Sequence, residues 1–347
     1  MNKAFITLCP NDVESEIQLP LNTLDKLQID KSRLGKNAKE KLDHNIFAVA
    51  RSNANVKSLI IKLANRGFFL VEHKGGVSTF ERFTTAHLFK KNLTNIDFPV
   101  HTHNGLYYTL EEPNIKTASP NLLIVFSSVA DFSLNASISR RNFFTNFKTI
   151  GKYIPSNTYI LRISDIGGVV GSFYLNNNFN SQIENDIQDL ILKVLSDTNV
   201  KRNNVVLYGV SKGGTGALFH GIKGGYKSVS VDPIVTDEYH EKKFNDPHFT
   251  QGTFPTSKQE KFTELFKNSE IRRNTNIIYS ENSPLYKHIN TIVRAGDISN
   301  KITFINSANP KINDHPDVGP NTINLLTLIL NNLFYELGNI SSKTVPV

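Results

Sequence analysis

Short apolar runs alternate with amphipathic segments along the last two-thirds of the chain. The runs have the length and composition of buried strands, and they cover residues 121–126, 158–164, 205–209, 227–232, 276–280 and 301–307. Between them apolar residues recur at helical spacing, which predicts helices at residues 182–195, 214–222, 261–268, 284–296 and 321–337. Strands that alternate with helices predict a parallel, doubly wound sheet. Right-handed crossovers would bring the loops after the strands to one edge, where ligands bind.

The first 115 residues have a different pattern. Residues 24–53 are polar and are predicted to be helical, and residues 56–67 form an amphipathic helix that stops at a glycine. Residues 68–73 and 98–112 have strand-like composition, the second with a turn at Asn104-Gly105. We therefore expect a smaller N-terminal α/β lobe of unknown role at residues 1–115 and a second domain at residues 116–347.

Composition narrows the classes of protein. The chain has 347 residues, of which 39% are hydrophobic and 20% charged, enough for a sizeable core. The net charge of +8 favours an anionic partner, although no nucleic-acid motif is present. A single cysteine, Cys9, excludes an intrachain disulfide and a cysteine-based zinc site. No window is apolar enough to span a membrane, and the N-terminus is a poor signal peptide, so we expect a cytoplasmic location.

The pentapeptide Gly209-Val210-Ser211-Lys212-Gly213 joins a predicted strand to a predicted helix. This spacing is that of a nucleophile elbow, in which small flanking residues allow a sharp turn that exposes the serine hydroxyl at a helix N-terminus. The alternative is a structural glycine turn. Two other glycine motifs fail, because no Gly-Lys-Ser/Thr run has P-loop spacing and Phe219 stands where a dinucleotide fingerprint needs its third glycine. Ser211 is therefore the predicted nucleophile.

A serine nucleophile needs a base and an orienting acid. His315 follows the last predicted strand, the position expected for the base; the alternative is a loop histidine between acidic neighbours. Glu281 follows the strand at 276–280 and is the first choice for the acid. Many hydrolases place an aspartate directly before a proline there, but this chain has Ser283. Asp232 is the second choice, and a Ser–His dyad is the third.

Two backbone N–H groups are needed to bind the oxyanion of an acyl-transfer intermediate. Lys212 follows the nucleophile and should supply one of them. The other should come from the loop after residues 121–126, from Ser127 or Ser128. The glycine-rich loop of typical lipases is absent at this place.

Two further loops are expected at the same edge of the sheet. Their side chains offer contacts for an anionic substrate, with surface charge and packing as the alternative; the candidates are Arg140, Arg141, Asp165 and Tyr174. His101 and His103 form a His-x-His pair, but a third ligand is missing, so no metal site is predicted.

The elbow, together with GGVVGSFYL (167–175) and NDHPDVG (313–319), resembles the XcbB/CpsF family of capsular polysaccharide biosynthesis proteins. The resemblance covers most of the chain and is clearest from about residue 120 onward. More distantly, the chain is similar to serine-dependent capsule O-acetyltransferases and to the acetyltransferase-like component of accessory secretion systems. The family implies an α/β-hydrolase-like domain behind a less familiar N-terminal region, and a role in capsule assembly. Ser211 and His315 match its motifs, whereas Ser283 leaves the acid unassigned.

Three functions follow as hypotheses. The first is a serine acyltransferase that O-acetylates an anionic capsular polysaccharide or its precursor, with acetyl-CoA as the acyl donor and no bound cofactor. The second is a carbohydrate esterase with the same machinery, since water and a sugar hydroxyl compete for one acyl-enzyme. The third is a non-catalytic assembly factor of the capsule biosynthesis machinery. The resemblance also allows a peripheral position at the inner membrane.

Overall fold

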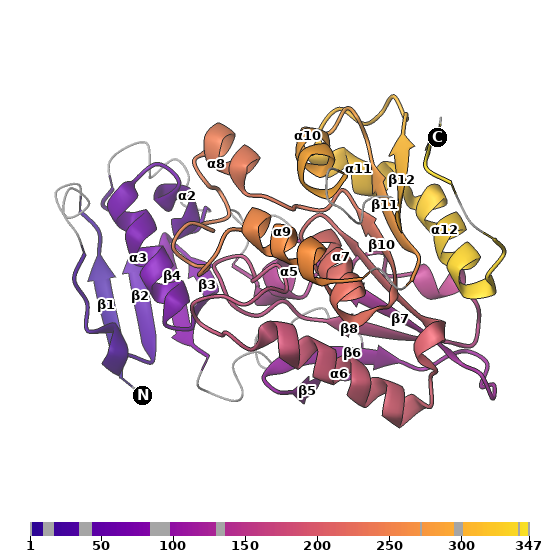
Figure 1. The fold of residues 1–347 in the computed structure, drawn as a ribbon. Helices are drawn as coiled ribbons and strands as arrows, with labels where there is room; N and C mark the ends of the chain where they lie inside the picture. Colours follow the sequence, from indigo (N-terminus) through magenta and orange to yellow (C-terminus); the bar gives the residue numbers. More distant parts are fainter. Residues whose placement is uncertain are drawn as a thin grey trace.

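The structure, a computed structural model, describes residues 2–9, 17–34, 44–83, 98–129, 136–270, 273–294, 301–338 and 341–345. In these ranges the strands form two sheets, a small one near the N-terminus and a large one built from the rest of the chain. Figure 1 shows the small sheet at one end of the molecule and the large sheet with its helices at the other.

Among the described residues, nine strands form the large sheet in the order β13-β12-β11-β10-β9-β7-β8-β6-β5. Their bounds are β5 (His101–His103), β6 (Leu106–Glu111), β7 (Asn121–Phe126), β8 (Thr158–Ile163), β9 (Val205–Val210), β10 (Lys227–Val231), β11 (Thr275–Tyr279), β12 (Ile302–Ser307) and β13 (Lys343–Val345). All pairings from β13 to β8 are parallel. The six predicted strands are β7 to β12, so the predicted mostly parallel, doubly wound sheet is confirmed.

Helices cover both faces of this sheet. On one face lie α6 (Ile183–Thr198), α7 (Lys212–Gly224) and α9 (Lys258–Asn268), and on the other lies α12 (Ile323–Tyr335). The shorter helices are α5 (Ile138–Asn142), η3 (Ile150–Lys152), η4 (Arg202–Asn204), α8 (Glu238–Phe244), α10 (Tyr286–His288), the π-helix η5 (Ile289–Arg294) and α11 (His315–Asn321). Residues 295 and 296 of the predicted helix 284–296 lie outside the described residues.

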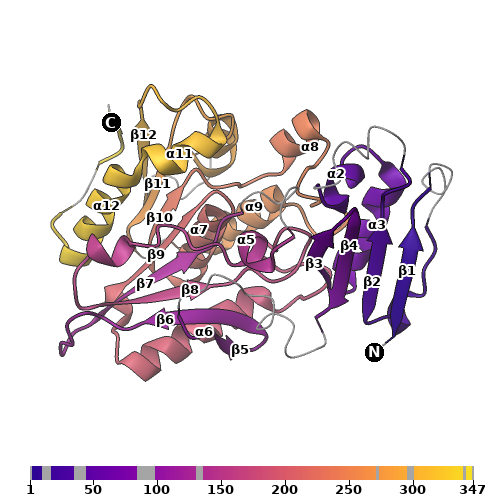
Figure 2. The ribbon, with the colours of Figure 1, turned by 180° about the vertical axis from the view of Figure 1, so that it is seen from behind.

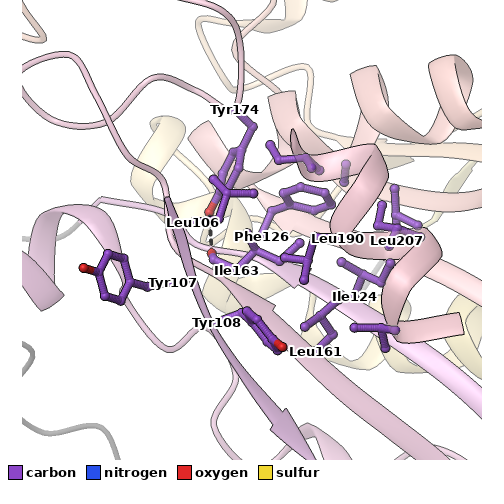
Figure 3. Close-up of a cluster of buried hydrophobic side chains, with 14 of the residues drawn as sticks. Leu106, Tyr107, Tyr108, Ile124, Phe126, Leu161, Ile163, Tyr174, Leu190 and Leu207 are labelled. Carbon is purple, nitrogen blue, oxygen red and sulfur yellow. Dashed lines mark hydrogen bonds between the residues drawn. The ribbon is translucent and has the colours of Figure 1, made fainter. Parts of the chain in front are cut away.

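Strand β7 shows why both faces are apolar. Leu122 and Ile124 pack into the core that contains α6, whereas Leu123 and Val125 pack into the core beneath α12. Successive side chains of a strand point to opposite faces, so a strand covered on both sides favours apolar residues at most positions, and five of the six residues of β7 are apolar. All six residues of β7 are buried. Figure 3 shows part of the first core, where Leu106, Ile124, Leu161 and Leu190 gather around Phe126.

The small sheet has the order β1-β2-β4-β3 and is covered by α2 (Ile46–Ala50) and α3 (Ala54–Asn65). Its strands are β1 (Lys3–Thr7), β2 (Lys26–Asp30), β3 (Phe68–Lys74) and β4 (Val77–Arg82), and η2 (Leu21–Thr23) precedes β2. Asn53 caps α3 through its side chain, which accepts the backbone N–H of Val56 at 2.9 Å. We call this small sheet with α2 and α3 the N-terminal lobe; the α/β lobe expected over residues 1–115 stays a prediction.

Two predictions within the first 115 residues were wrong. Residues 26–30 form a strand rather than a helix, because Leu27 and Ile29 alternate with polar residues and both are fully buried. Residues 35–43 of the same predicted helix lie outside the described residues. The hairpin β5–β6 does not belong to the small sheet, because β6 pairs antiparallel with β8 at the edge of the large one. The division of the chain at residue 116 stays a prediction.

The small lobe contacts the segment between α8 and α9. The ring of Phe47 lies 5.6 Å from that of Phe249, measured between centroids. Lys57 Nζ donates to the carbonyl oxygen of Asn245 at 2.7 Å, and Asn65 Nδ2 donates to that of Gly252 at 2.8 Å. The N-terminal lobe therefore supports a connection that belongs to the large sheet.

The order of the strands brings four loops to one edge. The chain places β8 on one side of β7 and then β9 on the other, so the sheet changes direction at β7. Loops at the carboxyl ends of strands beside such a reversal form the usual binding crevice. The loops after β7, β9, β10 and β12 all lie on this edge. In the described ranges, no helix has the length and hydropathy needed to cross a membrane.

Candidate active site

Ser211 lies in a sharp turn between β9 and α7. Its backbone has φ 55° and ψ −119°, a conformation that non-glycine residues rarely adopt. Its N–H donates to the carbonyl oxygen of Val231 at 2.9 Å, which fixes the turn against the end of β10. A side chain on Gly209 would overlap the backbone of Gly213, and one on Gly213 would overlap the carbonyl of Phe126. The two glycines are therefore required by close backbone packing at the elbow.

Ser211, His315 and Asp232 form a continuous hydrogen-bonded chain. Ser211 Oγ lies 2.7 Å from His315 Nε2, and His315 Nδ1 lies 2.7 Å from Asp232 Oδ2. The imidazole is partly buried, and the carboxylate is fully buried. Nδ1 must carry a proton to donate to the carboxylate, so Nε2 is left to accept the serine proton.

The start of α11 holds His315 in place. The Asp314 side chain accepts the N–H of His315 at 2.7 Å, and Asp317 accepts that of Asp314 at 3.1 Å. The second bond belongs to a capping box, in which the Asp314 side chain also accepts the N–H of Asp317, and Pro316 occupies the first turn. The acidic neighbours therefore bind backbone amides and fix the helix end that carries the imidazole.

The structure places Asp232, and not the first-choice Glu281, against His315. Glu281 lies in an exposed turn after β11, where its N–H donates to Asn306 Oδ1 at 3.1 Å. Asp232 directly follows β10 with φ 43°, and its N–H donates to the carbonyl oxygen of Ile278 at 2.8 Å. This left-handed turn at the end of β10 brings the carboxylate to the imidazole. The preference for Glu281 as the histidine's partner was therefore wrong.

Ser283 lies where many hydrolases have the acid, and it contacts the acid of this chain. Its Oγ donates to Asp232 Oδ2 at 2.6 Å, and the side chain is buried. The other oxygen, Asp232 Oδ1, is buried without a hydrogen-bond partner among the described residues. Oδ2 thus receives two short hydrogen bonds, which hold it toward His315.

The amides expected to bind an oxyanion lie at the ends of β7 and β9. Lys212 is the first residue of α7, so no carbonyl within the helix accepts its N–H. The N–H of Ser127 donates to Tyr174 Oη at 2.5 Å and is therefore occupied. Ser128 lines the cleft beside Ser211, and its Oγ donates to Asn146 Oδ1 at 2.7 Å. Of the two serines predicted to supply the second amide, Ser128 lines the cleft and Ser127 does not.

A cleft of about 700 Å³ opens above Ser211 and His315. Most of its walls are apolar or aromatic, and they include Val129, Phe144, Phe147, Tyr208, Val210, Tyr239, Phe244, Pro316, Pro320 and Ile323. One wall comes from α8 and the segment after it, which also contribute His240 and His248. Sequence reasoning missed this wall, because the segment contains no motif and is held by contacts with the N-terminal lobe that a local pattern does not reveal.

The histidines of this wall are held neutral. The ring of His240 lies 6.3 Å from that of His315 and 4.5 Å from that of His248, measured between centroids. Burial, followed by the charge of His315, lowers the pKa of His240 to about 3. Burial also lowers the pKa of His248 well below its ordinary value. Of the three histidines that line the cleft, His315 is the one that is hydrogen-bonded to both a serine and a carboxylate.

Three of the four predicted substrate contacts lie in the protein interior, which contradicts that role for them. Arg141 is buried and donates through Nη2 to the carbonyl oxygen of Leu70, while burial lowers its pKa to about 9. Asp165 and Tyr174 are fully buried beneath α7. Arg140 is partly exposed, with its guanidinium 5.4 Å from the ring centre of the cleft residue Phe144. Its contact with substrate stays a prediction.

His101 and His103 lie on the edge strand β5. His101 is exposed, and its ring lies 5.4 Å from that of Tyr108. Across the described ranges, no group of three or more His, Cys, Asp or Glu side chains is placed to hold a metal ion.

Comparison with known proteins adds information about the fold. No protein-family model and no curated protein matches the chain. Among solved structures, it is similar to the capsule O-acetyltransferase of Neisseria meningitidis serogroup A, with 15% identity and a TM-score of 0.50 over 70% of this chain and 99% of that one. It is also similar to the glycosylation-associated protein complex Gap123 of Streptococcus agalactiae, with 16% identity and a TM-score of 0.51 over 78% of this chain and 53% of that one. These likenesses, with the strand order and the elbow, establish an α/β-hydrolase-like fold. Membership of the XcbB/CpsF family stays a prediction.

Proposed function

We propose that the chain is a serine acyltransferase that transfers an acetyl group to a sugar hydroxyl through an acyl-enzyme on Ser211. The observation that carries this proposal is the hydrogen-bonded chain Ser211–His315–Asp232, with both distances at 2.7 Å. A strained serine, an imidazole within proton-transfer distance and a buried carboxylate on the far nitrogen are the parts that activate a hydroxyl for attack on an acyl carbon.

Acylation begins when Ser211 Oγ attacks the carbonyl carbon of the acyl donor. His315 Nε2 removes the hydroxyl proton as the Oγ–C bond forms, and Asp232 stabilises the resulting imidazolium. The carbonyl becomes an oxyanion, which the N–H groups of Lys212 and Ser128 would bind at the positive end of α7. The intermediate collapses when the bond to the leaving group breaks, and His315 returns the proton to that group.

Transfer repeats these steps with a sugar hydroxyl as the nucleophile. His315 Nε2 removes the proton of the acceptor hydroxyl, whose oxygen attacks the acyl carbon of the acyl-enzyme. The bond to Ser211 Oγ breaks, and the serine takes the proton back from His315. Water could enter the same step and give ester hydrolysis, so the outcome depends on which nucleophile the cleft admits.

The cleft favours transfer. Its volume of about 700 Å³ is in the range of sites for drug-sized ligands, and its walls beside Ser211 are largely apolar. Such walls exclude water from an acyl-enzyme and hold the apolar part of a donor such as acetyl-CoA, which enters as a substrate. The acetyl donor and the capsular acceptor come from the resemblance of GGVVGSFYL and NDHPDVG to capsule biosynthesis proteins, and the fold shared with a capsule O-acetyltransferase agrees with it. The net charge of +8 suits an anionic polymer.

Intact-mass spectrometry tests the proposal. The purified chain is incubated with a fluorophosphonate and, separately, with acetyl-CoA, and compared with Ser211→Ala. Ser119→Ala is the matched control, because this serine is exposed and remote from the cleft. We expect one fluorophosphonate adduct and one acetyl group on the wild type and on Ser119→Ala, and neither on Ser211→Ala.

The outcomes separate the candidate functions. Acetylation of Ser211 followed by faster loss of the acetyl group when capsular saccharide is added supports transfer. Fluorophosphonate labelling with rapid hydrolysis of simple esters and no effect of saccharide would mean an esterase. A wild-type chain that reacts with neither reagent would contradict an activated nucleophile and favour a non-catalytic assembly factor.

A further inference from the structure

We propose that Asp165 is the positioning residue of the oxyanion hole, because its contacts hold the start of α7 and the end of β7. These are the two backbone segments whose N–H groups would bind the oxyanion. The inference rests on the proposed function. Asp165 follows β8 and is fully buried, so it cannot contact substrate. One set of its contacts leads to Lys212, which carries the first amide. Another leads to Tyr174, which binds the N–H of Ser127, the residue before the second amide at Ser128.

The first set of contacts fixes the start of α7. Lys212 Nζ lies 2.8 Å from Asp165 Oδ2, and both side chains are almost completely buried. The same ammonium donates to the carbonyl oxygens of Arg141 at 2.9 Å and Val170 at 3.0 Å. Lys212 is the residue whose own N–H is expected to bind the oxyanion. Its side chain therefore ties this amide to a buried carboxylate on the neighbouring loop.

The second set of contacts fixes the end of β7. Asp165 Oδ1 accepts the N–H of Ser172 at 2.9 Å and of Tyr174 at 3.1 Å, and Oδ2 accepts that of Phe173 at 3.0 Å. Tyr174 then returns to β7, where its Oη accepts the N–H of Ser127 and donates to the carbonyl oxygen of Ile163 at 3.1 Å. Figure 3 shows the bond from this phenol to Ile163, with the Tyr174 ring beside that of Phe126. The N–H of Ser127 is thereby held by the buried phenol, whereas the next residue, Ser128, lines the cleft.

The loop would not keep this shape without the carboxylate. Phe173 and Tyr174 have φ of 55° and 63°, left-handed values that cost free energy for side chains with a Cβ. Three N–H groups that converge on one buried anion offset this cost. Gly171 also has a positive φ, and a Cβ there would collide with both Asp165 and Lys212. The loop is therefore built around the ion pair.

Removing the charge of Asp165 or the hydroxyl of Tyr174 should therefore misplace an amide without touching the serine or the histidine. Burial lowers the pKa of Lys212, and the negative charge of Asp165 opposes that shift. In Asp165→Asn the ammonium would lose its counter-ion, and the loop would lose its anionic acceptor. In Tyr174→Phe only the phenol is lost, so the N–H of Ser127 is released while the ion pair remains. The second variant keeps the inference testable if the first fails to fold.

The test is the rate constant of Ser211 acylation by p-nitrophenyl acetate, measured as the initial burst. Removing one oxyanion donor typically slows acyl transfer by about 10²–10³-fold. Because these donors would be displaced and not removed, we expect the acylation rate constant to fall by about tenfold to a hundredfold in both Asp165→Asn and Tyr174→Phe. KM and the midpoint of the pH–rate profile should stay unchanged, because binding and His315 are not altered. A loss of stability alone would reduce the amount of active protein and leave the rate constant per labelled Ser211 unchanged.

Matched controls exist for both changes. Tyr226→Phe removes a buried phenol whose oxygen has no hydrogen-bond partner in the described ranges. Glu81→Gln neutralises a partly buried acid that pairs with Lys26 in the small sheet, away from the cleft and from the loop that Asp165 holds. Both should acylate at the wild-type rate. Wild-type rates in Asp165→Asn and Tyr174→Phe, with Ser211 of the wild type labelled normally, would overturn the inference alone. A wild type unlabelled at Ser211 would overturn the proposed function and the inference with it.

Discussion

Ser283 Oγ lies 2.6 Å from Asp232 Oδ2, and the same carboxylate oxygen accepts the imidazole Nδ1–H of His315 at 2.7 Å. Asp232 follows β10, whereas Ser283 lies in the turn after β11, one strand further along the sheet. Two strand ends therefore meet at one imidazole. Asp232 and Ser283, which occupies the place where many hydrolases have the acid, thus form a hydrogen-bonded pair.

Asp232→Asn should nearly abolish acyl transfer. An asparagine of the same shape can present its NH₂ group to Nδ1, which favours the tautomer that cannot accept the serine proton. In a serine hydrolase this change lowers kcat by about 10⁴-fold, and we expect a fall of about 10³–10⁴-fold here. The measurement is kcat for an activated acetyl ester.

Glu281→Gln is the matched control for that change. Glu281 lies in an exposed turn and makes its hydrogen bond to Asn306 through the backbone, so its carboxylate is not needed there. We expect kcat within about twofold of wild type. A large loss in Glu281→Gln, with near-normal activity in Asp232→Asn, would reverse the assignment of the acid.

A carboxylate at position 283 should be able to replace the one at position 232 as the partner of His315. Because Ser283 Oγ is 2.6 Å from the oxygen that binds His315, a carboxylate at position 283 would lie near the imidazole. The double variant Asp232→Ser, Ser283→Asp should therefore regain at least about tenfold of the activity lost in Asp232→Ser. Equal activity of the two variants would mean that position 283 cannot orient the histidine.

Gly213→Ala should destabilise the fold at the elbow. The added Cβ would overlap the carbonyl oxygen of Phe126, and neither backbone can move without displacing β7 or α7. Forced overpacking of this kind costs about 1–3 kcal/mol. Gly151→Ala is the comparison, because its Cβ meets only the flexible end of Ile160 at 3.2 Å. Urea denaturation of both variants measures the difference, and equal midpoints would contradict the prediction.

Stability should fall between pH 6.5 and pH 4 through His220. This histidine is fully buried in α7, and burial lowers its pKa to about 4, while an unfolded histidine has a pKa near 6.5. The unfolded chain binds the proton first, so the contribution is complete above pH 6.5 and is lost as the pH falls toward 4. The shift corresponds to about 3 kcal/mol. Urea denaturation at pH 6.5 and 5 should show a smaller loss for His220→Gln, whose amide can still donate to the carbonyl oxygen of Tyr174. An unchanged loss would assign the pH dependence to other groups.

The sequence predicts the large sheet well because its strands are covered on both faces. Runs such as residues 122–126 contain only apolar side chains, so they stand out without knowledge of their partners. The small sheet is harder to predict. Strand β2 is short and lies in a polar stretch, and its pattern of alternating Leu27 and Ile29 covers only five residues. Pairing with β1 and β4 stabilises it, and such pairing is not visible in a local pattern.

The site was predictable where a motif fixes local geometry. The turn at Ser211 and the position of His315 after β12 follow from the order of elements. The partner of His315 was not predictable, because Asp232 and Glu281 both follow strands and only the left-handed turn at Asp232 decides between them. The buried roles of Asp165 and Tyr174 were also hidden, since a polar residue after a strand usually lies at the surface.

The attachment of the N-terminal lobe limits where the chain can be cut. A fragment starting at residue 116 would lose β5 and β6 and leave β8 as an open edge, a surface that promotes aggregation. It would also remove Phe47 from Phe249, and Lys57 from Asn245, in the segment that walls the cleft. The wall of the cleft that α8 and the following segment form is thus supported by the N-terminal lobe, and a fragment that begins at residue 116 would lack this support.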